Sequence, residues 1–326
     1  MRPPAPLHTC YVIVSQWGTF LFIGVFMDTK EAKTFEEQLE KIKDRGCEVG
    51  DENYAIQTLQ HINYYRLTAY FLPYKTKDNK YKSGTTFNKV HRTHEFDRKL
   101  RHILFSVVEE IELMLRTQLS YYHAHKYGSL GSMDENNFSK RHNNEKFMEH
   151  IKNAIKKNDK QKFVKHHIEK YNGNFPLWVI IELFTCGELS LFYADMHLPD
   201  KKDFANKIFS TTYNNLQQWL HDFTILRNYC AHYTTLYYNH FPAIPPTPKG
   251  FSYTLGKRVF DYILVLKFLF HSPEKLNTAL ILPLESLLNE YEDSIELTHI
   301  GFPENWKNIL KEATPKRNPP VIKNDN

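Results

Sequence analysis

Arg227, Asn228 and His232 are residues whose types and spacing could do chemistry, within the segment Arg-Asn-Tyr-Cys-Ala-His. A histidine can take the proton from a ribose 2′-hydroxyl or return one to a leaving 5′-oxygen. An arginine can hold the scissile phosphate and offset the charge of a pentavalent transition state. On a helix, the Asn228 amide shares a face with His232, four residues on, and can orient substrate or imidazole. Together these residues could cleave RNA without a metal.

Spacing alone does not single out this segment, because the chain has 17 histidines. An arginine precedes a histidine by five to seven positions at Arg227–His232, Arg2–His8 and Arg116–His123. The first residues form a proline-rich leader in which no helix would fix the geometry. Arg116 lies four residues after Glu112, so a structural ion pair is its expected role. For Arg227 and His232, a surface arginine with a histidine that caps a helix end stays as the open alternative.

The elements that must position these residues are helices. From Thr34 onward apolar residues recur at steps of three and four, and Thr34 with Glu37 forms a capping box. We expect helices over 35–45, 51–72, 95–126, 213–238, 255–270 and 284–291, and one from 176 that is interrupted near Gly187. Residues 129–160 are a polar, lysine-rich insert that could hold one helix. Without any alternating strand pattern, the chain is predicted to be an all-α bundle that carries Arg227 and His232 on one helix.

Composition narrows the function classes. The chain of 326 residues is 41% hydrophobic, has a net charge of +5 and contains only 12 glycines. It has neither a Gly-rich phosphate loop nor a CxxC pair, so Cys10, Cys47, Cys186 and Cys230 are expected to be reduced thiols of a cytoplasmic protein. His61 and His166–His167 have no ligand partners at metal spacing. We therefore expect no metal and no cofactor.

Four segments are expected along the chain. Residues 1–26 are an extension or arm, 27–242 a helical body, 243–250 a proline linker, and 251–326 a C-terminal helical appendix. Residues 10–27 form an apolar run near the lower limit for a membrane span. Polar residues dilute it, so three interpretations stay open: a weak anchor, a buried arm, or an upstream extension ahead of Met27. We expect no stable membrane association.

Several stretches, spread over most of the chain, carry a resemblance to a known family. They are TFEEQLEKIKDRG (34–46), HINYYRLTAYFLPYK (61–75), FDRKLRHILFSVVEEIELMLRTQLSYYHAHKYG (96–128), PLWVIIELFTCGELSLFY (176–193), WLHDFTILRNYCAH (219–232) and GFPENW (301–306). The chain resembles the Abi family of bacterial abortive-infection proteins, the AbiD/AbiF-like group. The resemblance implies the HEPN superfamily, a HEPN-type helical bundle with additional N- and C-terminal helices, and catalytic roles for Arg227, Asn228 and His232. Family members often have a second histidine next, whereas Tyr233 stands here.

The resemblance also implies partners. HEPN sites are generally composite, so a homodimer would bring two copies of Arg227 and His232 together. It further implies kinship with RNA-guided CRISPR nucleases and a possible regulatory or guide non-coding RNA. The leading expectation is a metal-independent endoribonuclease acting in anti-phage defence or as a toxin, with Tyr229 and Tyr233 able to stack bases of the RNA substrate.

Two other classes of function stay open. One is a catalytically idle RNA-binding scaffold, which the lysine-rich insert would equally fit (Lys152, Lys156, Lys157, Lys160, Lys162 and Lys165). Charge runs are more often solvated faces than nucleic-acid grooves. The other is a membrane-associated effector that uses residues 10–27.

Overall fold

The computed structural model describes residues 14–15, 18–19 and 31–313. Two short strands, β1 (Val14–Ser15) and β2 (Gly18–Thr19), pair antiparallel. All other regular elements of the described chain are helices, which confirms the predicted all-α class. Most of the apolar run at 10–27 lies outside the described residues. None of the described helices combines the length and apolar character that a membrane crossing requires.

The helices follow one another as α1 (Phe35–Asp44), α2 (Glu52–His61), α3 (Tyr64–Thr68), η1 (Ala69–Tyr74), α4 (Phe87–Tyr127), η2 (Gly131–Met133), η3 (Glu135–Asn137), α5 (Asn144–Lys157), α6 (Lys162–Lys170), α7 (Leu177–Ile180), η4 (Ile181–Leu183), α8 (Cys186–Asp195), α9 (Leu198–Phe209), α10 (Tyr213–Ala231), α11 (Val259–Leu269), α12 (Pro273–Leu276), η5 (Asn277–Ile281), α13 (Leu282–Glu290), α14 (Leu297–Ile300) and α15 (Trp306–Lys311).

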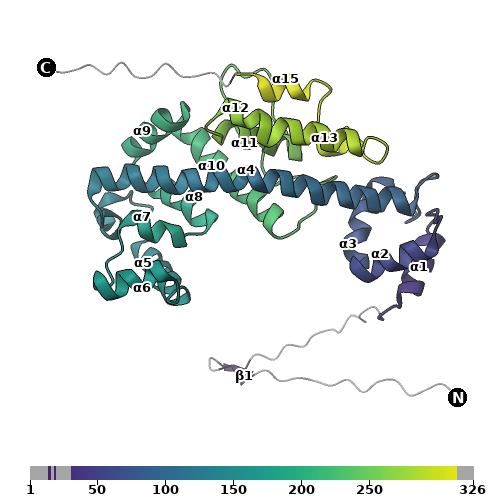
Figure 1. The fold of residues 1–326 in the computed structure, drawn as a ribbon, viewed down its shortest axis with the longest axis horizontal. Coiled ribbons are helices and arrows are strands. Elements are labelled where there is room, and N and C mark those ends of the chain that lie inside the picture. Colours follow the sequence, from purple (N-terminus) through teal and green to yellow (C-terminus); the bar gives the residue numbers. More distant parts are fainter. Residues whose placement is uncertain (1–13, 16–17, 20–30, 314–326) are drawn as a thin grey trace.

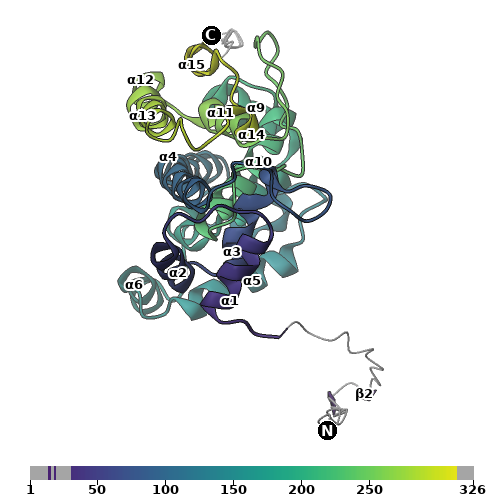
Figure 2. The same ribbon diagram turned by 90° about the vertical axis from the view of Figure 1, so that its right-hand side faces the viewer.

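The 41-residue helix α4 is the axis of the molecule. In Figure 1 it runs the length of the body, with α11, α12, α13 and α15 on one side, α5 to α8 on the other side at one end, and α1 to α3 at the other end. Figure 2, turned by 90°, shows α4 nearly end-on between these groups. Its buried apolar residues form the central stripe of the core, including Leu100, Leu104, Val107, Ile111 and Leu115.

Helix α11 is the centre of the C-terminal part. All of its residues from Val259 to Leu269 are buried, as expected of a helix that is apolar on every side. It packs on α10 and on α4. The proline-rich segment 243–250 has no helix, but the Trp219 indole donates to the Pro246 carbonyl oxygen at 2.8 Å and Tyr262 to that of Ala243 at 3.1 Å. This segment is thus attached to the helices on both of its sides.

Capping side chains explain the starts of several helices. The predicted Thr34–Glu37 capping box is present, and Asp51 caps α2 as expected. A second capping box, Thr185 with Glu188, begins α8, so the interruption expected near Gly187 falls at Phe184–Thr185 instead. These local hydrogen bonds satisfy amides that have no partner within the helix.

Several predicted boundaries were wrong. The helix expected over 51–72 is divided, because Ile62 is extended and the Asn63 side chain caps the new helix α3. Helix α4 begins at Phe87 rather than at 95, because the Thr86 hydroxyl accepts from the Lys89 amide. Helix α9 was not foreseen. The helix expected over 213–238 ends at Ala231, whereas the one helix allowed for in the insert 129–160 is present as α5.

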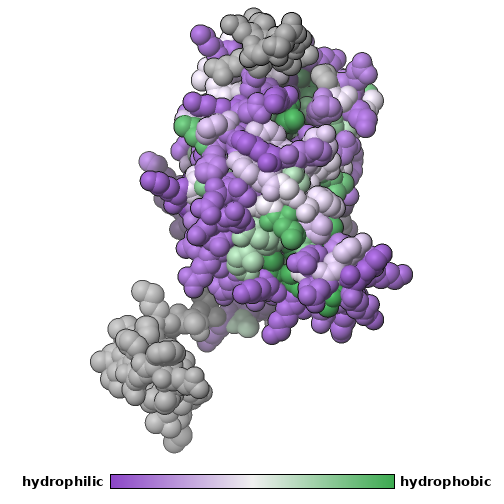
Figure 3. Space-filling model, turned by 90° about the vertical axis from the view of Figure 1, so that its left-hand side faces the viewer, coloured by the Kyte–Doolittle hydropathy of each residue, from purple (hydrophilic) through white to green (hydrophobic). Residues whose placement is uncertain are grey.

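The end of the molecule that faces the viewer in Figure 3 has a mostly hydrophilic surface. Hydrophobic residues gather below the middle of that face, with charged and polar residues around them. This end is formed by the C-terminal end of α4 and the helices near it.

Candidate functional site

The candidate site lies at the C-terminal end of α10. Phe223 and Leu226 are buried and fix one face of the helix in the core, as the sequence predicted. Arg227 and Asn228 in the last turns are half-buried. His232 is the C-cap residue directly after the helix, and it is exposed. The imidazole is therefore accessible, whereas the arginine is held against the protein.

Arg227 is held by a carboxylate of α4. Its Nε lies 3.2 Å from Oε2 of Glu112, and its Nη1 donates to Oδ1 of Asn228 at 3.4 Å. The other oxygen of Glu112 pairs with Arg116 at 2.6 Å. Glu112 thus links two arginines and ties α10 to α4. The contacts of Arg227 use part of the five N–H donors of its guanidinium, and the rest can serve an anion.

The alternative pair, Arg116 and His123, is structural. Arg116 donates to the carbonyl oxygens of Ile181 at 2.5 Å and Phe184 at 2.8 Å in addition to its predicted ion pair with Glu112. His123 is completely buried and stacks on Phe138. Burial lowers the pKa of His123 to about 4. Neither side chain is available to a substrate.

The chain turns sharply after His232. The Tyr233 amide donates to the Cys230 carbonyl oxygen at 3.4 Å and the Thr234 amide to that of Tyr229 at 2.9 Å, which is the hydrogen-bond pattern of a Schellman motif. The left-handed position, usually a glycine, is Tyr233 with φ of 59°. A non-glycine residue there is strained by about 1–2 kcal/mol. Strain of this kind persists where the surroundings hold it in place.

Two arginines hold the strained turn. Arg66 of α3 donates to the Tyr233 carbonyl oxygen at 2.6 Å, and Arg101 of α4 donates to the Thr234 carbonyl oxygen at 3.4 Å. Both contacts join residues far apart in the sequence. The direction in which the chain leaves the candidate site is therefore set by α3 and α4, and α10 alone does not determine it.

Asp97 is the central acceptor of the hydrogen bonds that hold this turn and the residues after it. Its buried carboxylate accepts from the Tyr70 hydroxyl at 2.7 Å, from the Leu236 and Tyr237 amides at 3.2 and 2.9 Å, and from Arg101. Burial raises the pKa of Asp97, and the Arg101 charge and these hydrogen bonds oppose that rise. This network was not predicted from the sequence. The signal was visible as a charged i, i+4 pair, Asp97 and Arg101, within an apolar helix stripe.

A groove of about 860 Å³ ends at the last turn of α10. Cys230, Ala231 and Tyr233 line it, together with Phe105 and Glu109 of α4. The other ionisable residues that line it are all basic: His61, Arg66, His94, Arg98, Arg101 and His102. Arginines and an exposed aromatic ring suit an anionic ligand with planar groups, such as a nucleic-acid segment.

The two tyrosines that sequence analysis selected differ in environment. The Tyr229 ring stacks on Phe241 with centroids 5.1 Å apart, so one of its faces is already covered. The Tyr233 side chain is 64% exposed and lines the groove. Of the two, Tyr233 has the geometry that base stacking requires.

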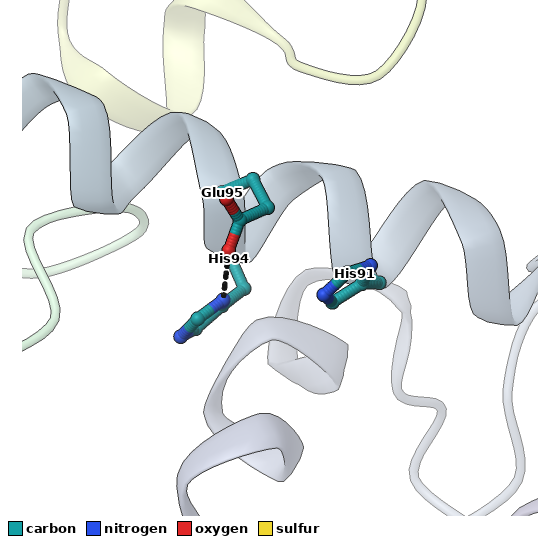
Figure 4. A group of neighbouring side chains, drawn as sticks. All are labelled: His91, His94 and Glu95. Carbon is teal, nitrogen blue, oxygen red and sulfur yellow. Dashed lines mark ion pairs between the residues drawn. The ribbon is translucent and has the colours of Figure 1, made fainter. Parts of the chain in front are cut away.

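His91, His94 and Glu95 form a second cluster, on α4. Their ligand atoms all lie within 4.8 Å of one another, and Figure 4 shows the three side chains on neighbouring turns of the helix. Burial lowers the pKa of His94 to about 4. This group was not among the histidines weighed as metal ligands from the sequence, although the spacing i, i+3, i+4 places its members on one face. It can hold a metal ion by the chemistry of its donors.

Comparison with known proteins identifies one family. The model of a family described as Abi-like protein matches residues 57–238, which is more than half of the chain and includes Asp97, Arg227 and His232. No curated protein and no solved structure matches the chain.

Proposed function

Because the chain belongs to the Abi-like protein family, whose role is in abortive infection, we propose that it is a metal-independent endoribonuclease of the HEPN type, active in the cytoplasm in anti-phage defence. The observation that carries the proposal is the arrangement at the end of α10. His232 is exposed there, and Arg227 is held nearby in the last turns by Glu112. The first can move a proton and the second can bind a phosphate.

The proposed reaction is attack of a ribose 2′-hydroxyl on the adjacent phosphate. The 2′-oxygen forms a bond to phosphorus, and the bond from phosphorus to the 5′-oxygen breaks. One imidazole takes the 2′-proton, and another returns a proton to the leaving 5′-oxygen. Arg227 stabilises the charge of the transition state. The products are a 2′,3′-cyclic phosphate and a 5′-hydroxyl, and Asn228 orients Arg227 through their mutual contact.

Each chain has one copy of the motif and supplies one imidazole. A reaction that uses two imidazoles therefore requires two chains, so the proposal includes a homodimer. Two apolar side chains of α4 support an interface beside the site: Phe105 is 40% and Leu113 is 54% exposed. They are eight residues apart and lie on a similar side of the helix. Light scattering during size-exclusion chromatography should give twice the chain mass, and a monomer that still cleaves RNA would contradict the composite site.

The test of the nuclease is cleavage in EDTA. Wild type should cut RNA and release ends that polynucleotide kinase labels without prior phosphatase treatment, and His232→Ala should be inactive. His125→Ala is the matched control. It also replaces an exposed histidine and should retain activity. That histidine lies about 36 Å along α4 from Arg101, which contacts the turn after His232. Equal cleavage by wild type and His232→Ala would refute the assignment.

A second function, an idle RNA-binding scaffold controlled by a partner RNA, is favoured by the groove that Arg66 and Arg98 line. The lysines of the insert are all exposed, as on a solvated face or a phosphate-binding surface. The scaffold predicts RNA affinity that falls steeply with salt, without cleavage by wild type.

A further inference from the structure

We propose that His91, His94 and Glu95 bind a transition-metal ion of the Zn²⁺ class on the N-terminal half of α4. The three residues come from two adjacent turns of one long helix, so the backbone fixes their relative positions. Their ligand atoms lie within 4.8 Å of one another (Figure 4), and rotation about side-chain bonds is enough to bring them to the separation of metal ligands.

Two of the three residues are oriented by neighbours. The Tyr54 hydroxyl of α2 lies 2.5 Å from Nδ1 of His91, which leaves Nε2 of that ring for a metal. Arg98 donates from Nε and Nη2 to Oε2 of Glu95 at 3.1 and 2.8 Å, which leaves Oε1. Metal ligands in proteins are typically held in this way by a hydrogen bond on the atom that does not bind the metal.

His94 supplies the independent observation. Its side chain is about nine-tenths buried, and its Nδ1 has no hydrogen-bond partner of acceptable geometry. That nitrogen lies 3.3 Å from Oε1 of Glu95, the oxygen that Arg98 leaves free. A buried polar atom whose nearest acceptor is too poorly aligned for a hydrogen bond is costly and uncommon. A metal between Nδ1 of His94 and Oε1 of Glu95 would satisfy both atoms.

The donor set indicates which ion fits. Two imidazole nitrogens and one carboxylate oxygen suit Zn²⁺ and its neighbours in the first transition row, whereas Ca²⁺ and Mg²⁺ prefer oxygen ligands. Three protein ligands leave a fourth position for water or another small ligand. Of the three ligands, His94 also lines the groove that ends at α10, so this ligand can be reached from the groove.

The test is Zn²⁺ titration of the untagged full chain by calorimetry, with Co²⁺ absorption as a probe of the ligand geometry. Wild type should bind one Zn²⁺ that the variant His91→Ala/His94→Ala does not bind. His166→Ala/His167→Ala, which removes two histidines from α6, should keep that site. Tyr54→Phe should weaken binding by about 10–100-fold, because it removes only the hydroxyl that orients His91.

The folding of each variant is checked by unfolding in metal-free buffer, where every variant should unfold cooperatively. Glu95→Gln retains the shape of the side chain and guards against a folding defect of the histidine variants; it should also weaken Zn²⁺ binding. Wild-type binding that the cluster variants leave unchanged would overturn the proposal, as would the absence of stoichiometric binding by wild type. RNA cleavage in EDTA does not enter this test, so the site and the nuclease can fail separately.

Discussion

Replacing Asp97 by asparagine tests whether the buried network holds the segment after His232. The side chain is 0% exposed, and that of its partner Arg101 is 5% exposed. Asparagine keeps the shape but offers one acceptor oxygen where the Tyr70 hydroxyl, two backbone amides and Arg101 now donate. An orphaned buried donor costs about 1–3 kcal/mol. With the buried Arg101 charge uncompensated, we expect the free energy of unfolding to fall by about 3–5 kcal/mol.

Urea unfolding measures that loss, and a double-mutant cycle assigns it to the pair. The control Asp78→Asn, at an exposed loop position, should change stability by no more than about 0.5 kcal/mol. Asp97→Asn/Arg101→Met should be less destabilised than the sum of the two single variants, by up to about 3 kcal/mol. Hydrogen exchange should show that the Leu236 and Tyr237 amides lose protection in Asp97→Asn. A loss below about 1 kcal/mol, or strictly additive single variants, would refute the reasoning.

Two further predictions concern buried or strained residues near these helices. In unfolded chains the pKa of His123 returns from about 4 toward 6.5, so the folded protein binds fewer protons and loses stability as pH falls through this window. His123→Phe should remove that loss, about 3 kcal/mol between pH 7.5 and 4 by urea unfolding; identical pH profiles would contradict it. Tyr233→Gly should raise stability by about 0.5–1 kcal/mol, because glycine adopts the left-handed conformation without strain. If Tyr233 stacks RNA, the same variant should bind RNA more weakly; a lower unfolding midpoint would show that the turn is not strained.

The helices could be predicted from the sequence because their causes are local. Apolar residues at three- and four-residue steps place Leu100, Leu104 and Ile111 of α4 on one buried face. The Thr34–Glu37 capping box and the Asp51 cap involve residues within three positions of each other. Errors arose where a local signal was read too simply. Thr86 was overlooked as a cap, and the interruption of α7 and α8 was assigned to Gly187, although Thr185 is the residue that caps α8.

The candidate site was only partly visible in the sequence. Arg227, Asn228 and His232 were selected by type, spacing and family resemblance. The partner of Arg227 could not be predicted, because Glu112 lies 115 positions earlier. The only local signal at Glu112 was its pairing with Arg116, four residues on. The end of α10 was also misplaced. Residues 232–238 have enough apolar character to continue a helix, but the carboxylate of Asp97 takes the Leu236 and Tyr237 amides instead.

The sequence by itself determined the all-α class, the positions of most helices and the residues that could do chemistry, because periodicity and capping act within a few residues. Only the tertiary structure decided which arginine is available. Arg116 donates its hydrogen bonds to Glu112 and to two carbonyl groups, whereas Arg227 has N–H groups left to bind a ligand, five residues before the exposed His232. It also decided that His123 is a core residue and that the chain turns at Tyr233. The physical reason is that burial and ion pairing depend on contacts between residues far apart in the sequence, from 65 positions for Arg116 and Ile181 to 115 for Arg227 and Glu112.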